Sequence, residues 1–115
     1  LFDELDRAAG RPWVMLSAGA GMSEFRRVLH YAYSAGASGY LAVRAIWLEA
    51  FQRFPDWDGI RDELRGAAGP YMRELNELTG AMARPWHTHP CYGPAGARIE
   101  PADSTFRHVY AGFGG

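Results

Sequence analysis

This chain has no lysine, because all twelve of its basic residues are arginine. A Schiff-base lysine and the phosphate-binding lysine of a Walker motif are therefore excluded within its 115 residues. Cysteine occurs once, as Cys91, which excludes an internal disulfide and a zinc module built from several cysteines. No apolar run approaches the roughly 18 residues of a membrane helix, and no signal-peptide pattern opens the chain. We therefore expect no membrane contact and a reducing cytoplasm as the compartment.

A strong charge of either sign is lacking as well. The formal net charge is −1 and the isoelectric point is about 6.5, so the sequence shows no basic footprint for nucleic acid. With 48% hydrophobic and 22% charged residues, the composition is that of a globular protein with one domain at most. Because the chain opens on Leu1 inside an expected helix rather than on Met, we expect a fragment or a processed chain.

Hydrophobic spacing predicts helices that alternate with two short strands. The expected helices cover 1–9, 23–35, 45–54, a stretch after Asp56 or Asp58 and a stretch from Pro70 onward, and the expected strands cover 13–16 and 40–43. Ser23 is the expected N-cap of the second helix, and Gly10 is expected to end the first. Gly66 and Gly69 predict a break before the last helix.

Strands that alternate with amphipathic helices imply βαβ units and a parallel sheet, which makes this an α/β chain. Two strands alone leave both edges open and bury too little apolar surface to offset the chain entropy, so we expect further strands upstream. From residue 84 the composition changes to proline and glycine without periodicity. We therefore divide the chain into a structured unit over 1–86 and an irregular Pro/Gly-rich tail over 87–115.

The first candidate site is the turn after the first strand, Ser17-Ala18-Gly19-Ala20-Gly21. Small residues at the carboxyl end of a strand let backbone N–H groups approach an anion, and the start of the next helix adds partial positive charge. The alternative is a plain tight turn between strand and helix. The spacing G-x-G-x-x-G is missing, so a dinucleotide site is not supported.

The second candidate is Arg44, which directly follows the second strand and precedes a helix. A permanent cation at that place can grip a phosphate, sulfonate or carboxylate in a forked geometry. The alternative is a solvated arginine at the end of a strand. The two candidates strengthen each other, because the loops after two successive strands frequently form the phosphate site of an eight-stranded βα barrel.

Four motifs carry a resemblance to a known family. They are WVMLSAG over 13–19, AGAS over 35–38, GYLAVRAIW over 39–47 and RPW over 84–86. In this order and spacing the chain resembles the carboxy-terminal end of the tagatose-1,6-bisphosphate aldolase family, a group that includes sulfofructosephosphate aldolases. These are class I aldolases on a (β/α)8 TIM barrel. The resemblance covers about 1–86 and implies that the two strands are strands seven and eight, in a barrel that this chain holds only in part.

The resemblance also implies a phosphate site. Ser17, with the backbone around Ala18 and Gly19, would bind the phosphate of the substrate at the end of strand seven, and Arg44 would clamp it from strand eight. The family usually has glycine before this arginine, whereas this chain has Val43. The Schiff-base lysine and the acid/base carboxylate of the family belong to earlier strands, so the resemblance implies no catalytic residue in this chain.

The function that the resemblance implies is that of a carbon–carbon lyase without metal or other cofactor. It would cleave a phosphorylated ketose, of the tagatose 1,6-bisphosphate or sulfofructose phosphate type, to dihydroxyacetone phosphate and an aldehyde. This chain alone would be inactive because it has no lysine. The alternative is a non-catalytic anion-binding or assembly module that keeps the βα scaffold. Self-association into a homo-oligomer stays open.

The third candidate is His87-Thr88-His89-Pro90-Cys91. In an extended segment, residues two apart point to the same side, so His87 and His89 can share a metal with Cys91. A fourth ligand is not evident, although His108 is available. The interpretation that we favour is a tail packed on the barrel, with a histidine stacked on a neighbouring aromatic side chain, and no metal.

A strand's alternation also predicts which side chains share a face: Trp13, Met15 and Ser17 on the first strand, and Tyr40, Ala42 and Arg44 on the second. If both faces point into the barrel, the Ser17 hydroxyl and the Arg44 guanidinium meet above its carboxyl end. Because parallel strands lie about 4.8 Å apart, the arginine can then reach an anion held at the Ser17 turn. An ion pair between Arg44 and Glu49 would remove this grip.

Overall fold

The computed structural model describes residues 1–97, and the elements follow the predicted order. Helices α1 (Phe2–Ala9) and α2 (Met22–Ser34) alternate with strands β1 (Val14–Leu16) and β2 (Gly39–Leu41). Next come α3 (Arg44–Phe51), α4 (Trp57–Glu63), the π-helical turn η1 (Leu64–Ala68) and α5 (Gly69–Met82). Two 3₁₀ turns follow, η2 (Trp86–Thr88) and η3 (Pro90–Tyr92). The rest of the expected tail, with His108, lies outside the described residues.

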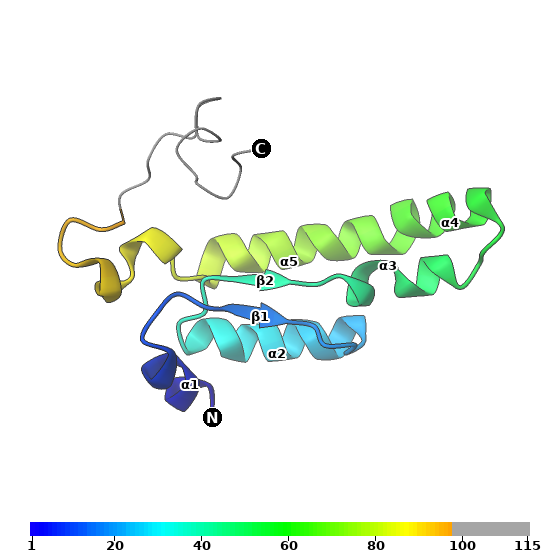
Figure 1. Ribbon diagram of the computed structural model, residues 1–115. Coiled ribbons are helices and arrows are strands. Elements are labelled where there is room, and N and C mark those ends of the chain that lie inside the picture. The colour runs from blue at the N-terminus through cyan, green and yellow to red at the C-terminus, as the bar shows by residue number, and fades with distance from the viewer. Residues whose placement is uncertain (98–115) are drawn as a thin grey trace, which may run out of the picture.

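The two strands pair in parallel, and α2 is the crossover between them (Figure 1). Val14 is opposite Gly39, and Leu16 is opposite Leu41. The ladder continues one step further, because the Ser17 N–H donates to the Leu41 carbonyl at 3.1 Å. The predicted parallel βαβ unit is thus confirmed. Both strands run toward the end where α3 begins, so their carboxyl ends meet at one edge of the sheet (Figure 1).

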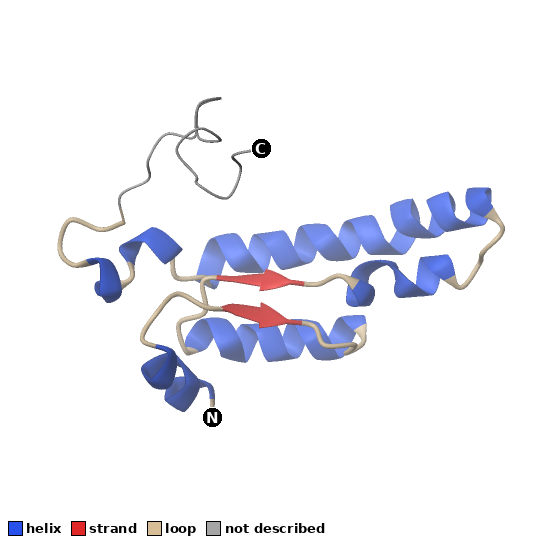
Figure 2. Ribbon diagram, viewed as in Figure 1, coloured by secondary structure: helices blue, strands red, loops and turns tan. Residues whose placement is uncertain are grey.

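One face of the sheet is covered by helices. α2 and α5 pack side by side against it (Figure 2), and their side chains Phe25, Leu29 and Leu75 are almost completely buried. Met15 and Tyr40 pack on this core from the strands. The face that carries Met15 and Tyr40 therefore points toward the helices. For Ser17 and Arg44 to meet, this face had to point away from the helices, and alternation along a strand does not say which side the helices cover.

The other face of the sheet is bare. Val14, Leu16 and Leu41 stand on it with 52–53% of their surface exposed, and Val43 with 46%. Among residues 1–97, no element covers these four branched apolar side chains. Complete burial of one such side chain contributes about 1.5–3 kcal/mol. The bare face therefore offers a large gain in free energy to any polypeptide that closes over it.

Three tyrosines tie α5 to the rest of the layer. The Tyr71 hydroxyl donates to the Met22 carbonyl at the start of α2, and the Tyr40 hydroxyl donates to Oδ1 of Asn76, both at 2.7 Å. The Tyr33 and Thr79 hydroxyls form a third contact of 2.7 Å. Burial raises the pKa of the Tyr71 hydroxyl to about 12. These bonds fix α5 against both the sheet and α2.

Two local predictions were wrong and one was confirmed. α2 begins one residue early, with Gly21 as its N-cap, so Ser23 does not cap it. The break expected near Gly66 and Gly69 is absent, because η1 joins α4 to α5 as one continuous helix. The wider π turn directly precedes Pro70, which has no N–H to give to a regular helix. Asp56 does cap α4, since its Oδ1 accepts from the Gly59 N–H at 2.9 Å.

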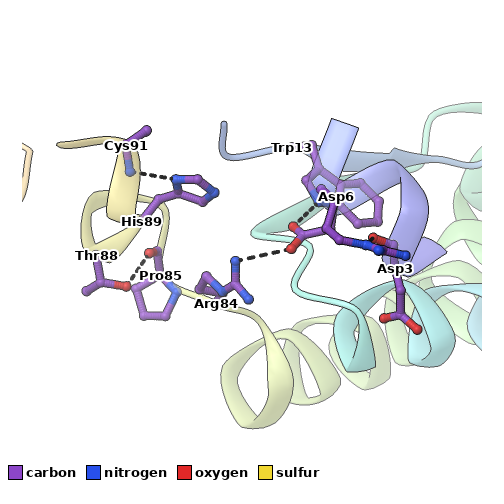
Figure 3. Close-up of polar contacts among 9 residues, drawn as sticks. Asp3, Asp6, Trp13, Arg84, Pro85, Thr88, His89 and Cys91 are labelled. Carbon is purple, nitrogen blue, oxygen red and sulfur yellow. Dashed lines mark hydrogen bonds and ion pairs between the residues drawn. The ribbon is translucent and has the colours of Figure 1, made fainter. Parts of the chain in front are cut away.

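At the amino-terminal ends of the strands, polar contacts close the unit (Figure 3). The Asp6 carboxylate accepts a hydrogen bond from Nε1 of Trp13 at 2.8 Å and pairs with Arg84 at 3.6 Å. The Arg84 N–H in turn donates to the Ala37 carbonyl at 3.0 Å. The chain after α5 is thereby held against α1, β1 and the turn before β2. This closure lies at the end of the sheet opposite to the candidate turn.

Candidate functional site

The first candidate is a tight turn in a conformation that non-glycine residues rarely adopt. The Ala20 N–H donates to the Ser17 carbonyl at 2.8 Å. Between them, Ala18 has φ 50° and Gly19 has φ 89°. Within residues 1–97, Ala18 is the one non-glycine residue with a positive φ, a conformation that costs about 1–2 kcal/mol. Such strain is typical of turns whose backbone shape serves a ligand, which makes this turn the leading candidate.

Arg44 reaches over this turn from the neighbouring strand. A Cβ placed on Gly19 would lie 3.6 Å from Nη2 and 3.9 Å from Cζ of Arg44. The guanidinium is exposed, and no carboxylate of residues 1–97 forms an ion pair with it, Glu49 included. The structure therefore brings two of the predicted site residues, Gly19 and Arg44, together at the carboxyl edge of the sheet.

The first backbone N–H groups of α2 and α3 are not capped by side chains. The N-caps of α2 and α3 are Gly21 and Val43, and neither makes a side-chain cap hydrogen bond. The first N–H groups of a helix have no partner within the helix itself. Uncapped N–H groups and a guanidinium are the donors that a phosphate or carboxylate accepts from. The arrangement can thus hold one anion between the turn, the start of α2 and Arg44.

Val43 departs from the glycine that the resemblance implies, and the backbone accommodates it. Its φ is −86° and its ψ is −75°, which any residue can adopt. The position therefore does not need the conformational freedom of glycine. The Val43 side chain stands on the bare face of the sheet, so it lines the same side as Val14 and Leu16.

Ser17 occupies a different environment from Arg44. Only 7% of the surface of Ser17 is exposed, and it lies on the side of the sheet that the helices cover. Arg44, in contrast, is exposed. The meeting of the Ser17 hydroxyl with the Arg44 guanidinium was predicted on the condition that both point to the same open side of the sheet, and the burial of Ser17 does not meet that condition. What Arg44 meets is the backbone of the turn at Gly19. The role of Ser17 in anion binding stays a prediction.

The third candidate, the segment 87–91, does not have the extended conformation that was expected. His87 lies in the 3₁₀ turn η2 and not in an extended segment, so the assumed sharing of a side with His89 fails. The His87 ring packs edge-on against Trp86 with 5.8 Å between centroids, rather than stacked as the favoured interpretation expected. His89 is 6% exposed, and its Nδ1 accepts from the Cys91 N–H at 3.1 Å (Figure 3). No group of three or more potential metal ligands occurs within the described range.

Comparison with known proteins finds similarity over most of the chain. The chain is 32% identical over 89 residues to tagatose 1,6-diphosphate aldolase 2 of Streptococcus mutans, and the match covers 74% of this chain and 27% of that protein. It is 33% identical, over the same shares, to the tagatose 1,6-diphosphate aldolases of Staphylococcus aureus strains JH9 and Newman. No family model matches. The chain thus spans about a quarter of the length of these curated relatives, and it is a segment related to aldolases.

A search of the described helices for a membrane span finds no stretch with the length and hydrophobicity that crossing a bilayer requires.

The division of the chain at residue 86 into a structured unit and a tail stays a prediction.

Proposed function

We propose that this chain is the phosphate-binding, carboxy-terminal part of a class I aldolase. In this proposal β1 and β2 are strands seven and eight of a (β/α)8 barrel. The turn at Ser17, Ala18 and Gly19 holds the phosphate of a ketose phosphate together with Arg44. The observation that carries the proposal is the position of the Arg44 guanidinium over Gly19, exposed and without a carboxylate partner in residues 1–97.

The bare face of the sheet supports the barrel. In such barrels the helices cover the outside, and layers of Val, Ile and Leu side chains fill the inside. The four exposed residues Val14, Leu16, Leu41 and Val43 match that interior in type and in side. Active sites of these barrels lie at the carboxyl ends of the strands, where the Ser17–Ala20 turn and Arg44 also lie. Similarity to tagatose-bisphosphate aldolases points the same way.

The chemistry is divided between this segment and the rest of the proposed enzyme. A lysine elsewhere forms an imine with the ketose carbonyl, and the imine accepts the electron pair of the carbon–carbon bond that breaks. This chain has no lysine and supplies the anion grip. Binding energy from the phosphate then orients the reacting carbon over the imine, which lowers the barrier through proximity. The products are dihydroxyacetone phosphate and an aldehyde.

A second candidate is a non-catalytic anion-binding module on the same scaffold, which the exposed Arg44 guanidinium over Gly19 would serve equally well. The reading frame upstream separates the two. A lysine at the end of a preceding apolar strand supports the aldolase, because only that residue can form the imine. A preceding segment without one supports the module.

Binding of inorganic phosphate to the full chain, followed by amide ¹H–¹⁵N spectra, tests the grip. We expect shifts at the Ser17–Ala20 turn and at the first turn of α2. An exposed charge-assisted contact is worth about 1.5 kcal/mol, so Arg44→Gln should weaken phosphate roughly tenfold. Arg44→Lys should restore only part of the affinity, because an ammonium cannot form the fork. Arg65→Gln, which removes an equal charge on η1, should have no effect. Equal affinity in Arg44→Gln and Arg65→Gln contradicts the site.

A further inference from the structure

A second site candidate lies on the opposite surface of the helical layer. A groove of about 440 Å³ opens on the solvent side of α2, where Leu78 of α5 reaches it. Its lining consists of Ser23, Arg26, Arg27, His30, Tyr31 and Leu78. The buried residues Phe25 and Leu29 lie on the other side of α2, toward the core. The groove shares no residue with the Ser17–Arg44 site, and both of its walls belong to the described chain.

The groove is cationic, because two arginines and no carboxylate line it. Arg26 is partly engaged, since Glu74 at the groove's rim lies 3.6 Å from its Nη1. Arg27 makes no ion pair with a carboxylate of residues 1–97. Ser23, Arg27 and Tyr31 follow each other at four-residue spacing, which stacks them along one row of the helix. Arg27 is therefore the cation best placed to receive an anion.

The groove also has a flat, apolar side. Tyr31 is 60% exposed, and the His30 ring packs edge-on to it with 6.2 Å between centroids. Leu78 adds an aliphatic surface from α5. Exposed tyrosine and arginine planes accept the face of a ring by stacking. The volume lies within the range of about 300–1,000 Å³ that is usual for small-molecule sites.

We propose that this groove binds a small organic anion that contains both a phosphate and a flat ring, with a nucleoside monophosphate as the model ligand. Arg27, supported by Arg26 and the Ser23 hydroxyl, takes the phosphate, and Tyr31 with Leu78 takes the ring. A long polyanion fits less well, because the chain has a net charge of −1 and no basic stripe beyond the groove. The proposal stands apart from the aldolase proposal and does not depend on it.

Titration of the full chain with AMP, adenosine and inorganic phosphate, read in amide ¹H–¹⁵N spectra, tests the groove. We expect AMP to shift the amides of Ser23–Tyr31 and Leu78, with at least fivefold higher affinity there than adenosine or phosphate alone. Arg27→Gln should weaken AMP at least fivefold, and Tyr31→Ala should reduce the advantage of AMP over phosphate. The charge-matched variant Arg65→Gln should leave AMP binding unchanged.

Arg44→Gln separates the two proposals. It should weaken phosphate binding at the Ser17–Ala20 turn roughly tenfold and leave AMP binding on α2 intact. The groove proposal is overturned if AMP shifts only the turn, if Arg27→Gln and Arg65→Gln behave alike, or if phosphate alone binds the groove as well as AMP does. The dispersion of the same spectra shows for each variant that the chain is folded.

Discussion

The guanidinium of Arg84 fills the space beside Gly36 in which any other residue would carry its Cβ. A Cβ at Gly36 would come within 2.6 Å of Nη2 and 2.8 Å of Cζ of Arg84. Gly36 has φ 109°, in the region that glycine alone adopts without strain. The turn before β2 and the segment after α5 therefore depend on each other, through a contact that only glycine permits.

Gly36→Ala should destabilise the chain for both reasons. The positive φ costs about 1–3 kcal/mol. The flexible end of Arg84 must also shift from its place beside Asp6, which adds little because the ion pair is partly exposed. We expect a loss of about 2–3 kcal/mol in urea unfolding followed by tryptophan fluorescence. Gly66→Ala is the matched control, because nothing lies within 4 Å of its Cβ position in η1. It should be neutral or stabilising by up to about 1 kcal/mol. Equal losses in both variants would show that neither the positive φ of Gly36 nor its contact with Arg84 matters.

The two faces of the sheet should respond differently to truncation. Leu75 is completely buried in the helical layer, and Leu75→Ala should cost about 2–5 kcal/mol in urea unfolding. Leu41 is 52% exposed on the bare face, and Leu41→Ala should cost less than about 1 kcal/mol in the isolated chain. In a longer polypeptide that closes over this face, the cost at Leu41 should rise toward that at Leu75. A large loss at Leu41 in the isolated chain would mean that the face is already covered.

Alkaline pH should weaken the contact between α5 and α2. The folded-state pKa of Tyr71 is raised to about 12, against an ordinary value of 10.0, mainly by burial. The folded state therefore holds this proton more tightly than the unfolded state. The resulting stability is complete below pH 10 and is lost as the pH rises toward 12, with a slope of at most about 1.4 kcal/mol per pH unit.

Tyr71→Phe tests this pH dependence. It removes the hydrogen bond to the Met22 carbonyl, so we expect a loss of about 1 kcal/mol at pH 8 and a shallower decline above pH 10. Tyr31→Phe is the control, since Tyr31 is 60% exposed and forms no side-chain hydrogen bond in the described part of the chain. Unfolding curves at several pH values measure both. An unchanged alkaline slope in Tyr71→Phe would contradict the assignment.

This chain alone should form no imine with a ketose phosphate. It contains no lysine, so borohydride treatment in the presence of dihydroxyacetone phosphate should leave every internal residue of the folded chain unmodified. Mass spectrometry of the treated protein is the measurement, and a lysine-containing aldolase is the positive control. A stable reduced adduct located on an internal residue of this chain would overturn the division of chemistry that we propose.

The order of the elements was predictable because the apolar periodicity is local. Runs such as 13–16 and 40–43 have no polar interruption, and glycine or proline residues flank them, which is why both strands were found. The joint between α4 and α5 was missed because Gly66 and Gly69 usually break a helix, whereas here Gly66 lies inside the π turn and Gly69 begins α5. Gly10 behaved as predicted, closing α1 with φ 57°.

The candidate site was only half predictable. Arg44 and Gly19 follow successive parallel strands, so their approach at one sheet edge follows from topology. The position of Ser17 does not follow from topology. Alternation along a strand divides the side chains between two faces, but it does not say which face the helices cover. The left-handed backbone conformation of Ala18 could not be predicted, because alanine rarely adopts a positive φ. The groove on α2 was missed because it joins side chains of α2 with Leu78 of α5, which lie far apart in the sequence.

The one-sided sheet has a consequence for exchange between proteins. Its helical layer is already complete, with three tyrosine hydrogen bonds inside it, so a new neighbour disturbs none of those contacts. Such a neighbour has to match only two strand edges and the four apolar side chains on the bare face. We therefore expect that this segment can be joined to another protein in a chimera. If the chimera keeps those positions, the contact between Arg44 and the turn at Gly19 should be retained.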